Sequence, residues 1–309
     1  MQNRFTKKVL FVGIPDMAYV CLDGLLQSGV NIVGVIGPKK NHATFNDFKK
    51  FVDSKNLNFI EYEKLDEIGL IEKIKSLNPD IAVVCSFNYK IPKAMLESVK
   101  GGFINVHPSL LPKYRGPNPY SAAIIAGEKE TGVTLHFMDE NFDTGDIITQ
   151  KSIPISSLET MGTLFNRTNF LAFTMLLDSL KMFETNPLPR KKQPEGNFTK
   201  SEKYGEKSFF INYQRPAVEI ERFIRALNPF LVATTNFRGN LVKFFTAETF
   251  EGSSNQQVGT IVKIENDKFF IATKKGLLAP SVIQFGSFFV GNSKDFINIL
   301  NPKIGECFL

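Results

Sequence analysis

Apolar residues in the first half of the chain follow two alternating patterns. Short, nearly continuous apolar runs rich in β-branched residues occupy residues 9–12, 32–36 and 81–85. Such runs are typical of strands that are covered on both faces. Between them, apolar residues recur at the three- and four-residue spacing of amphipathic helices, over residues 18–28, 44–55 and 67–77. The alternation predicts an α/β fold, a Rossmann-like parallel sheet flanked by helices.

Two further strands are predicted at residues 103–107 and 131–138. Asn105 and His107 lie two positions apart on the first of them, so their side chains point to one face. Ligands of open α/β sheets bind beyond the carboxyl ends of the strands, and His107 lies at such an end. Asp143 follows the next strand in an acidic turn that can bend back over the same edge. We therefore expect these three side chains to converge.

The second half of the chain has a different character. Residues 161–183 predict a long helix, and residues 186–197 concentrate the proline, glycine and basic residues of a linker. Residues 216–227 predict another helix, and residues 231–309 carry short β-rich runs separated by turn sequences, which favours a small barrel. We predict a catalytic α/β domain at residues 1–186, a linker at 187–209 and a smaller, barrel-like β-rich domain of the OB type at 210–309.

The composition is that of an ordinary globular protein, with 43% apolar and 22% charged residues. The sequence has no apolar run long enough for a membrane span and no secretory signal, so we expect a cytoplasmic protein without membrane contact. The three cysteines, Cys21, Cys85 and Cys307, lack metal-binding spacing, and we expect free thiols and no metal site. A net charge of +6 would suit RNA or a nucleotide-linked substrate and does not choose between them.

Asparagine, histidine and aspartate together can transfer an acyl group to an amine. A carboxamide and an imidazolium can donate hydrogen bonds to a developing oxyanion, and a carboxylate can hold the imidazole charged or relay a proton. Each residue taken alone is more often a turn or structural residue, and we interpret His136 in that way. The combination of Asn105, His107 and Asp143 favours catalysis.

The segment from Gly102 to Asp146 resembles the folate-dependent formyltransferase family. The N-x-H-x-S-L-L-P element of that family appears at residues 105–112, and its D-x-G element appears at residues 143–145. The resemblance implies that Asn105, His107 and Asp143 are catalytic and that 10-formyltetrahydrofolate is the formyl donor. It also implies that the donor is bound by three short segments, made of Phe87, Tyr89, Lys90 and Ile91, of Ser109, Leu110, Leu111 and Pro112, and of Asp139, Glu140, Asn141 and Phe142.

Two classes of acceptor amine are compatible with the residues. Methionyl-tRNA formyltransferases carry a long basic insertion after the second strand, whereas residues 36–47 are short here. The short segment favours an amino group on a nucleotide-linked sugar. Lys113, Arg115 and Asn118 are candidates for binding its phosphate or sugar hydroxyls, since arginine can hold phosphate through two hydrogen bonds.

The alternative acceptor is initiator methionyl-tRNA. The positive charge, the basic residues 190–192 and the barrel-like second domain favour it, because such barrels often bind nucleic acid. A hydrolase that removes the formyl group from the folate would use the same three residues and is a third option. A binding protein with a decayed site is disfavoured because all three residues are present. A homodimer is compatible with the second domain.

Overall fold

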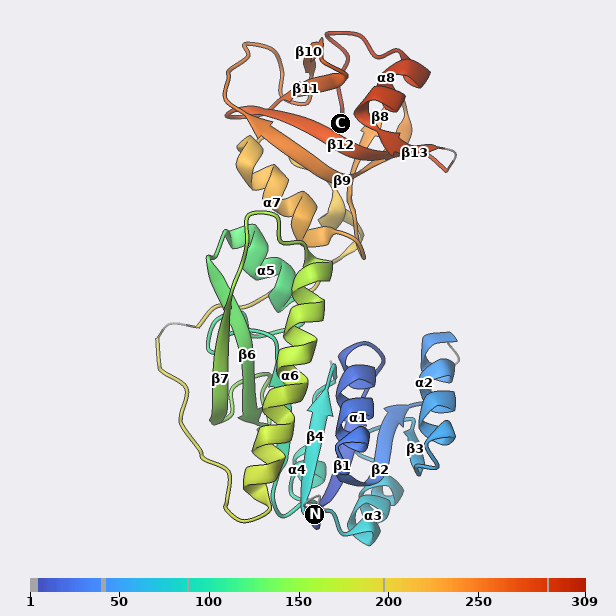
Figure 1. Cartoon of the computed structure of the whole chain (residues 1–309), viewed down its shortest axis with the longest axis vertical. Coiled ribbons are helices and arrows are strands. Elements are labelled where there is room, and N and C mark those ends of the chain that lie inside the picture. The colour runs from blue at the N-terminus through green and yellow to red at the C-terminus, as the bar shows by residue number, and fades with distance from the viewer. Residues whose placement is uncertain (1–4, 40–42, 88, 197, 288) are drawn as a thin grey trace. The chain divides into compact units, whose positions relative to one another are not determined.

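The computed structural model describes residues 5–39, 43–87, 89–196, 198–287 and 289–309. The chain forms two compact units that alternate along the sequence (Figure 1). The first unit contains Met1–Pro119, Glu130–Pro154 and Asn166–Ser201, and the second contains Tyr120–Lys129, Ile155–Phe165 and Glu202–Leu309. The domain boundaries expected at residues 186 and 209 stay a prediction.

The first unit is built on a mostly parallel sheet. Its strands, among the described residues, are β1 (Lys8–Gly13), β2 (Asn31–Pro38), β3 (Phe59–Tyr62), β4 (Ile81–Cys85), β5 (Phe103–His107), β6 (Glu130–Phe137) and β7 (Ile147–Pro154). They lie in the order β3-β2-β1-β4-β5-β6-β7. The first five are parallel, whereas β6 is antiparallel to β5 and β7 is antiparallel to β6. The predicted α/β class is confirmed, with two antiparallel strands added at one edge.

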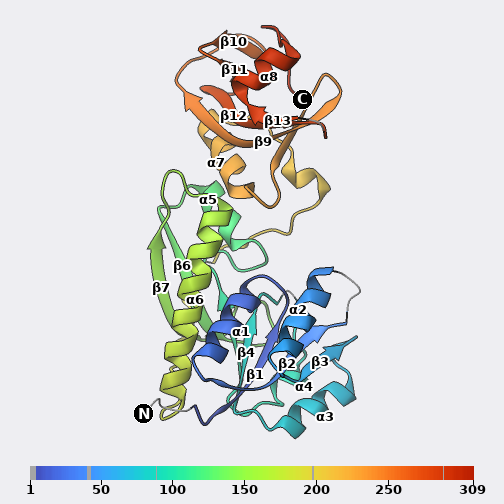
Figure 2. The same cartoon turned by 45° about the vertical axis from the view of Figure 1, so that its right-hand side comes forward.

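Helices cover both faces of this sheet. In the first unit these are α1 (Met17–Gln27), α2 (Ala43–Ser54), α3 (Ile68–Leu77), α4 (Lys93–Leu96) and most of α6 (Met161–Phe183), whereas α5 (Pro119–Ala126) falls almost entirely in the second unit. On one face, Leu10 of β1 shares a buried cluster with Ile74 of α3 and Met95 of α4. On the other, α1 and α6 lie side by side (Figures 1 and 2). A Cβ atom at Gly24 would lie 2.5 Å from the Phe173 ring, so glycine permits this close packing.

The second unit contains an antiparallel β-rich domain. Its described elements are α7 (Ala217–Leu227), β8 (Ala233–Phe237), β9 (Asn240–Phe250), β10 (Ile261–Glu265), β11 (Lys268–Ala272), β12 (Leu277–Phe285), β13 (Phe289–Asn292) and α8 (Ser293–Leu300). The strands run in the order β10-β11-β12-β9-β8, and β13 pairs with β12. Phe237 and Phe308 stack at 4.6 Å between ring centroids in the core, and Phe269 and Phe296 stack at 5.1 Å. The predicted β-rich C-terminal domain is confirmed.

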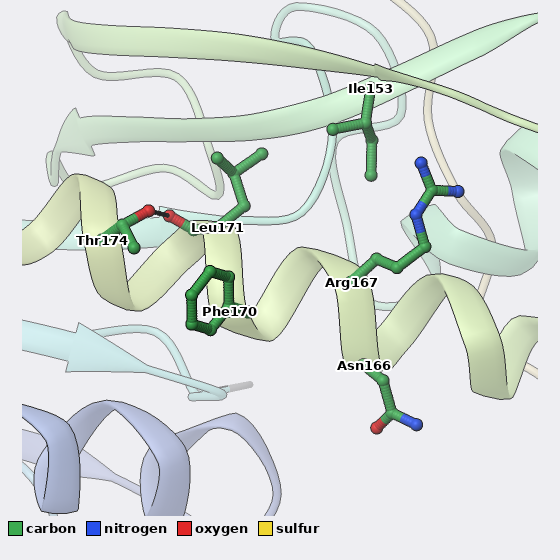
Figure 3. Close-up of a pocket in the computed structure, with 6 residues that line it drawn as sticks. All are labelled: Ile153, Asn166, Arg167, Phe170, Leu171 and Thr174. Carbon is green, nitrogen blue, oxygen red and sulfur yellow. Dashed lines mark hydrogen bonds between the residues drawn. The ribbon is translucent and has the colours of Figure 1, made fainter.

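An open hollow of about 530 Å³ lies between β7 and α6 (Figure 3). Its lining residues are Ile153, Asn166, Arg167, Phe170, Leu171 and Thr174. The Arg167 guanidinium donates a hydrogen bond to the Pro154 carbonyl oxygen at 3.1 Å. This lining includes no residue predicted for the site. Within the part of the chain that the structure describes, no helix combines the length and apolarity needed to cross a membrane.

Candidate active site

The structure brings Asn105, His107 and Asp143 together. Asn105 and His107 lie on one face of β5, and both are buried, with 8% and 4% of their surface exposed. Asp143 lies in the loop between β6 and β7, which bends back to the same face. Its Oδ1 atom is 3.5 Å from His107 Nδ1 and 3.4 Å from Asn105 Nδ2. The convergence expected from the sequence is therefore present, and the catalytic roles remain a proposal.

The loop that carries Asp143 is folded tightly upon itself. Asp139 Oδ1 accepts hydrogen bonds from Asn141 N at 2.9 Å and from Thr144 Oγ1 at 2.6 Å. A Cβ atom at Gly145 would lie 1.9 Å from the Phe137 carbonyl oxygen, a distance that no side chain tolerates. These local constraints return the chain toward β5 immediately after β6 ends.

The carboxylate of Asp143 is held by a main-chain donor as well as by the side chains. Gly116 N donates a hydrogen bond to its Oδ2 atom at 2.8 Å. Asp143 itself has a φ of 57°, a left-handed conformation that is uncommon for a residue other than glycine. Such a conformation persists when the surrounding structure holds it, and it is frequent at functional sites.

His136 completes the cluster. It lies opposite Asn105 in the β5–β6 register and is 1% exposed. Its Nδ1 atom is 2.8 Å from the Phe137 carbonyl oxygen, which can only accept, so Nδ1 carries a proton and donates it. Its Nε2 atom lies 3.1 Å from Asn105 Nδ2 and 3.6 Å from Asp143 Oδ1. The structural role expected for His136 stays an interpretation, and the structure places its ring beside Asn105 and Asp143.

A hydrogen bond to Tyr114 selects the tautomer of His107. The His107 Nε2 atom lies 2.9 Å from the Tyr114 carbonyl oxygen, so Nε2 carries a proton and donates it. The other nitrogen, Nδ1, faces the Asp143 carboxylate. Tyr114 has a φ of 58°, and its main-chain N donates to Thr199 Oγ1 at 2.8 Å. The linker thus fixes the residue that orients the histidine.

The electrostatics of the cluster separate the protonation states of its members. Burial lowers the pKa of His107 below its ordinary 6.5, and the Asp143 carboxylate opposes this shift only in part. Burial raises the pKa of the Asp143 carboxyl, but His107, His136 and the Gly116 N–H outweigh it and lower the pKa to about 2. At neutral pH the site therefore holds an ionised carboxylate beside a neutral imidazole. Among the described residues, no group of three or more His, Cys, Asp and Glu side chains is arranged to hold a metal ion.

The segment predicted to contact the donor after β5 is a rigid part of the core. Ser109 is fully buried, and its hydroxyl donates to the Lys113 carbonyl oxygen at 2.6 Å. Thr134 Oγ1 donates to Ser109 O at 2.6 Å and accepts from Leu111 N at 3.1 Å. Gln150 Nε2 donates to Leu111 O at 2.8 Å. Ser109 and Leu111 therefore shape this loop from inside, while Leu110 is partly exposed and Pro112 is buried.

The other two predicted donor segments are neighbours. Lys93 Nζ at the start of α4 lies 3.9 Å from Glu140 Oε1 of the acidic loop. Phe87 and Tyr89 meet edge to face at 5.4 Å between ring centroids. Tyr89 is partly exposed, Lys90 is exposed and Ile91 is buried, and residue 88 between them lies outside the described residues. Glu140, Asn141 and Phe142 are exposed, so this loop offers a surface close to the cluster.

The residues predicted to contact the acceptor also make hydrogen bonds within the protein. The Arg115 guanidinium donates to Gln193 Oε1 from Nε at 3.2 Å and from Nη2 at 2.6 Å. Asn118 N donates to Ser201 Oγ at 3.1 Å. Lys113 is exposed, and its carbonyl accepts from Ser109. Their contacts with an acceptor stay a prediction. Gln193 was not predicted, because no motif distinguishes it within the linker.

The fold and the clustered site define a formyl-transferring enzyme, and comparison with known families agrees. The family model described as formyl transferase matches residues 7–180, and the model described as formyl transferase, C-terminal domain, matches residues 203–301. The chain belongs to the formyl transferase family, and it is a folate-dependent formyltransferase, as the sequence resemblance implied.

The chain is also similar to individual curated relatives and solved structures. Methionyl-tRNA formyltransferase of Agathobacter rectalis is 32% identical over 283 residues, covering 90% of this chain and 91% of the relative. That of Clostridioides difficile is 33% identical and covers 90% and 92%. The N-formyltransferase of Helicobacter canadensis, solved in complex with folinic acid and dTDP-3-aminofucose, is 19% identical with a TM-score of 0.69, covering 89% of this chain and 99% of that one. At that identity the likeness shows a shared fold.

Proposed function

We propose that this enzyme transfers the formyl group of 10-formyltetrahydrofolate to the amino group of initiator methionyl-tRNA. The chemical half of the proposal depends on the convergence of Asn105, His107 and Asp143, with contacts of 3.4 and 3.5 Å. The acceptor half depends on relatives above 30% identity that bear the name methionyl-tRNA formyltransferase. These relatives favour initiator methionyl-tRNA as the acceptor over the nucleotide-linked amino sugar that the short segment at residues 36–47 favoured.

The residues present fit a reduced folate. The acidic loop turns its Asp139 side chain inward to bond its own main chain, so it can present main-chain groups to a ligand. Phe87 and Tyr89 provide aromatic edges that suit a planar ring. When bound, 10-formyltetrahydrofolate supplies the formyl carbon as an electrophile. The bound folate must therefore place its formyl group beside the cluster of Asn105, His107 and Asp143.

The protonation states of His107 and Asp143 suit removal of a proton from an amine. His107 is neutral at neutral pH, and its Nδ1 lone pair can accept the proton that the attacking nitrogen loses. Asp143, 3.5 Å away, stabilises the imidazolium that results. Asn105 can redirect the amide hydrogen of its long 3.4 Å contact toward the oxygen on which charge develops.

The short connection after β2 carries less weight than the relatives. Strand β2 ends at Pro38 and α2 begins at Ala43, and residues 40–42 lie outside the described part of the chain. The two relatives align over 91% and 92% of their own lengths, which leaves little room for large additional segments in them. Exposed cations in the linker, Lys191 and Lys192, are compatible with RNA, whose phosphates dominate affinity.

A direct comparison of acceptors tests the proposal. The purified protein is supplied with 10-formyltetrahydrofolate and either methionyl-tRNA, methionyl-tRNA with a blocked amino group, or a panel of nucleotide-linked amino sugars. We expect transfer to unblocked methionyl-tRNA at least about 100-fold faster than to any sugar, with a rate constant at low tRNA concentration that falls steeply with salt. Faster transfer to an amino sugar would overturn the assignment of the acceptor.

A further inference from the structure

The linker contributes a side chain that contacts both loops of the site. We infer that Gln193 is a positioning residue for formyl transfer, which holds the main chain of Asp143 and the guanidinium of Arg115 in one arrangement. The inference rests on the proposed role of Asp143 in formyl transfer. It does not depend on which amine accepts the group.

The carboxamide of Gln193 uses its full hydrogen-bonding capacity within the protein. Its Nε2 atom donates to the carbonyl oxygens of Asp143 at 2.8 Å and of Gly145 at 2.9 Å. Its Oε1 atom accepts from Arg115 Nε at 3.2 Å and Nη2 at 2.6 Å. A carboxamide offers two donor hydrogens and two acceptor lone pairs, so all four are engaged. Gln193 therefore acts through its neighbours and leaves no group for a ligand.

The contacts of Gln193 are made where the site needs support. Asp143 holds a left-handed φ of 57°, which is costly unless neighbouring atoms retain it. Gln193 binds the carbonyl of that residue and the carbonyl two positions later, on both sides of the turn. The Asp143 carboxylate is directed toward His107 only while this turn is kept. Loss of both donors would let the loop relax.

The second anchor, Arg115, lies between two residues that contact the cluster. Tyr114 orients His107 through its carbonyl oxygen, and Gly116 donates to the Asp143 carboxylate. The linker also binds the main chain of Arg115, which donates to Thr199 O at 3.0 Å and accepts from Ser201 N at 2.7 Å. Gln193 thereby connects the loop that orients His107 to the loop that carries Asp143.

Gln193 is distinguished from its neighbours in the linker. It is half-buried, whereas Lys192, Pro194 and Glu195 are exposed. Two residues earlier, Lys191 exchanges main-chain hydrogen bonds of 2.7 and 2.9 Å with Ile147 of β7. The linker is therefore fixed to the sheet edge just before it delivers Gln193 to the site.

Matched substitutions test the inference. Gln193→Met keeps the length of the side chain and removes all four hydrogen bonds. Because a displacement of about 1 Å in an active site can cost about 100-fold, we expect kcat to fall about 10- to 100-fold while KM for the donor changes less than about threefold. Glu195→Met, the same substitution at an exposed linker position, should leave both constants unchanged. A Gln193→Met loss confined to KM would overturn the inference.

A conservative substitution gives a readout that a purely structural role would not produce. Gln193→Glu keeps an acceptor for Arg115 and sets a carboxylate oxygen against the carbonyls of Asp143 and Gly145. We expect a loss at neutral pH at least equal to that of Gln193→Met. Relative to the wild type at the same pH, this loss should become smaller at lower pH as the introduced carboxyl gains a proton and becomes a donor. Wild-type kcat for both Gln193 variants would contradict the inference.

A measurement without an acceptor separates this inference from the proposed function. Amide hydrogen exchange of residues 139–146 should accelerate about 10-fold in Gln193→Met, with the melting temperature and exchange elsewhere unchanged. Equal acceleration throughout the first unit would mark a general structural residue and overturn the inference. Failure of the wild type to formylate methionyl-tRNA would contradict the acceptor alone, and the kinetic comparison would then be made with the active amino sugar.

Discussion

The Tyr114 carbonyl oxygen lies 2.9 Å from His107 Nε2, and this hydrogen bond determines which ring nitrogen faces Asp143. A carbonyl oxygen only accepts, so it retains the proton on Nε2 and leaves Nδ1 as the basic atom. That atom is 3.5 Å from the Asp143 carboxylate. The pair is thus arranged to receive a proton and to stabilise the charge that follows.

Removing either member of this pair should abolish formyl transfer. We expect His107→Ala and Asp143→Asn to lower kcat by about 1,000-fold or more, because proton transfer and charge stabilisation are lost together. Circular dichroism and thermal melting should show a retained fold, since Asn at position 143 can still accept from Gly116 N. Turnover at the wild-type rate in both variants would refute the roles proposed for them.

The pH dependence of the rate should follow the lowered pKa of His107. The base must be neutral to accept a proton, and burial keeps its pKa below 6.5. We expect kcat, measured at saturating acceptor so that ionisation of the free amine does not contribute, to stay level through neutral pH and to decline only below pH 6.5, in a profile measured from about pH 5 to 9. An acidic limb at or above pH 6.5 would show that His107 is not the group that titrates.

Stability should also depend on pH through this histidine. Its pKa is lower in the folded than in the unfolded chain, so the unfolded chain binds more protons below pH 6.5. The associated stability is complete above pH 6.5 and is lost as the pH falls toward the folded-state pKa. Urea unfolding at several pH values should show that the free energy of unfolding depends less steeply on pH in His107→Gln than in the wild type. Identical slopes would contradict this prediction.

Asp143 should affect stability in a lower range. Its folded-state pKa of about 2 lies below the ordinary 3.8, so its contribution is present above pH 3.8 and is lost as the pH falls through about 2. Urea unfolding of Asp143→Asn between these limits should show a weaker dependence on pH than the wild type. An unchanged dependence would mean that other carboxyl groups dominate acid unfolding.

Two threonines on β6 provide a matched test of the loop predicted to bind the donor. Thr134→Val removes the hydroxyl that bonds Ser109 O and Leu111 N, and we expect a loss of about 1–3 kcal/mol in unfolding free energy together with a higher KM for the donor. Among the described residues, the buried hydroxyl of Thr131 has no hydrogen-bond partner. Thr131→Val should therefore be neutral or stabilising in chemical denaturation. Equal losses of unfolding free energy in Thr134→Val and Thr131→Val would contradict the importance of the Thr134 hydrogen bonds.

Two glycines test the return of the chain toward β5. Gly145→Ala places a Cβ atom 1.9 Å from Phe137 O, so the loop must shift, and we expect about 1–3 kcal/mol of destabilisation with a fall in kcat. Gly69 lies in α3 with no heavy atom within 4 Å of an added Cβ atom. Gly69→Ala should instead stabilise by about 0.5–1 kcal/mol. Thermal melting and kcat measurements on Gly145→Ala and Gly69→Ala test these two expectations.

The central strands could be predicted from the sequence because they are buried on both faces. β1 and β4 contain continuous apolar runs and β5 is wholly buried, whereas β3 has only four residues and β7 exposes half of its side chains at the sheet edge. Neither edge strand was predicted. Periodicity also carries no information on strand direction, so the antiparallel course of β6 and β7 appeared only in the structure.

The site was predictable in proportion to how locally it is encoded. Asn105 and His107 share a face because of their spacing alone. His136 joins them through the register of two strands, and Gln193 arrives from a segment 50 positions beyond Asp143. Contacts of that kind depend on tertiary packing, which leaves no local pattern in the sequence.

Expression of residues 1–186 as a separate fragment would remove Gln193 and Thr199 from the loops they support, although the fragment would retain Asn105, His107 and Asp143. It would also separate residues 120–129 and 155–165 from the rest of their unit. Hybrid enzymes made by exchanging the second unit should therefore keep residues 187–201 from the same parent as the catalytic sheet.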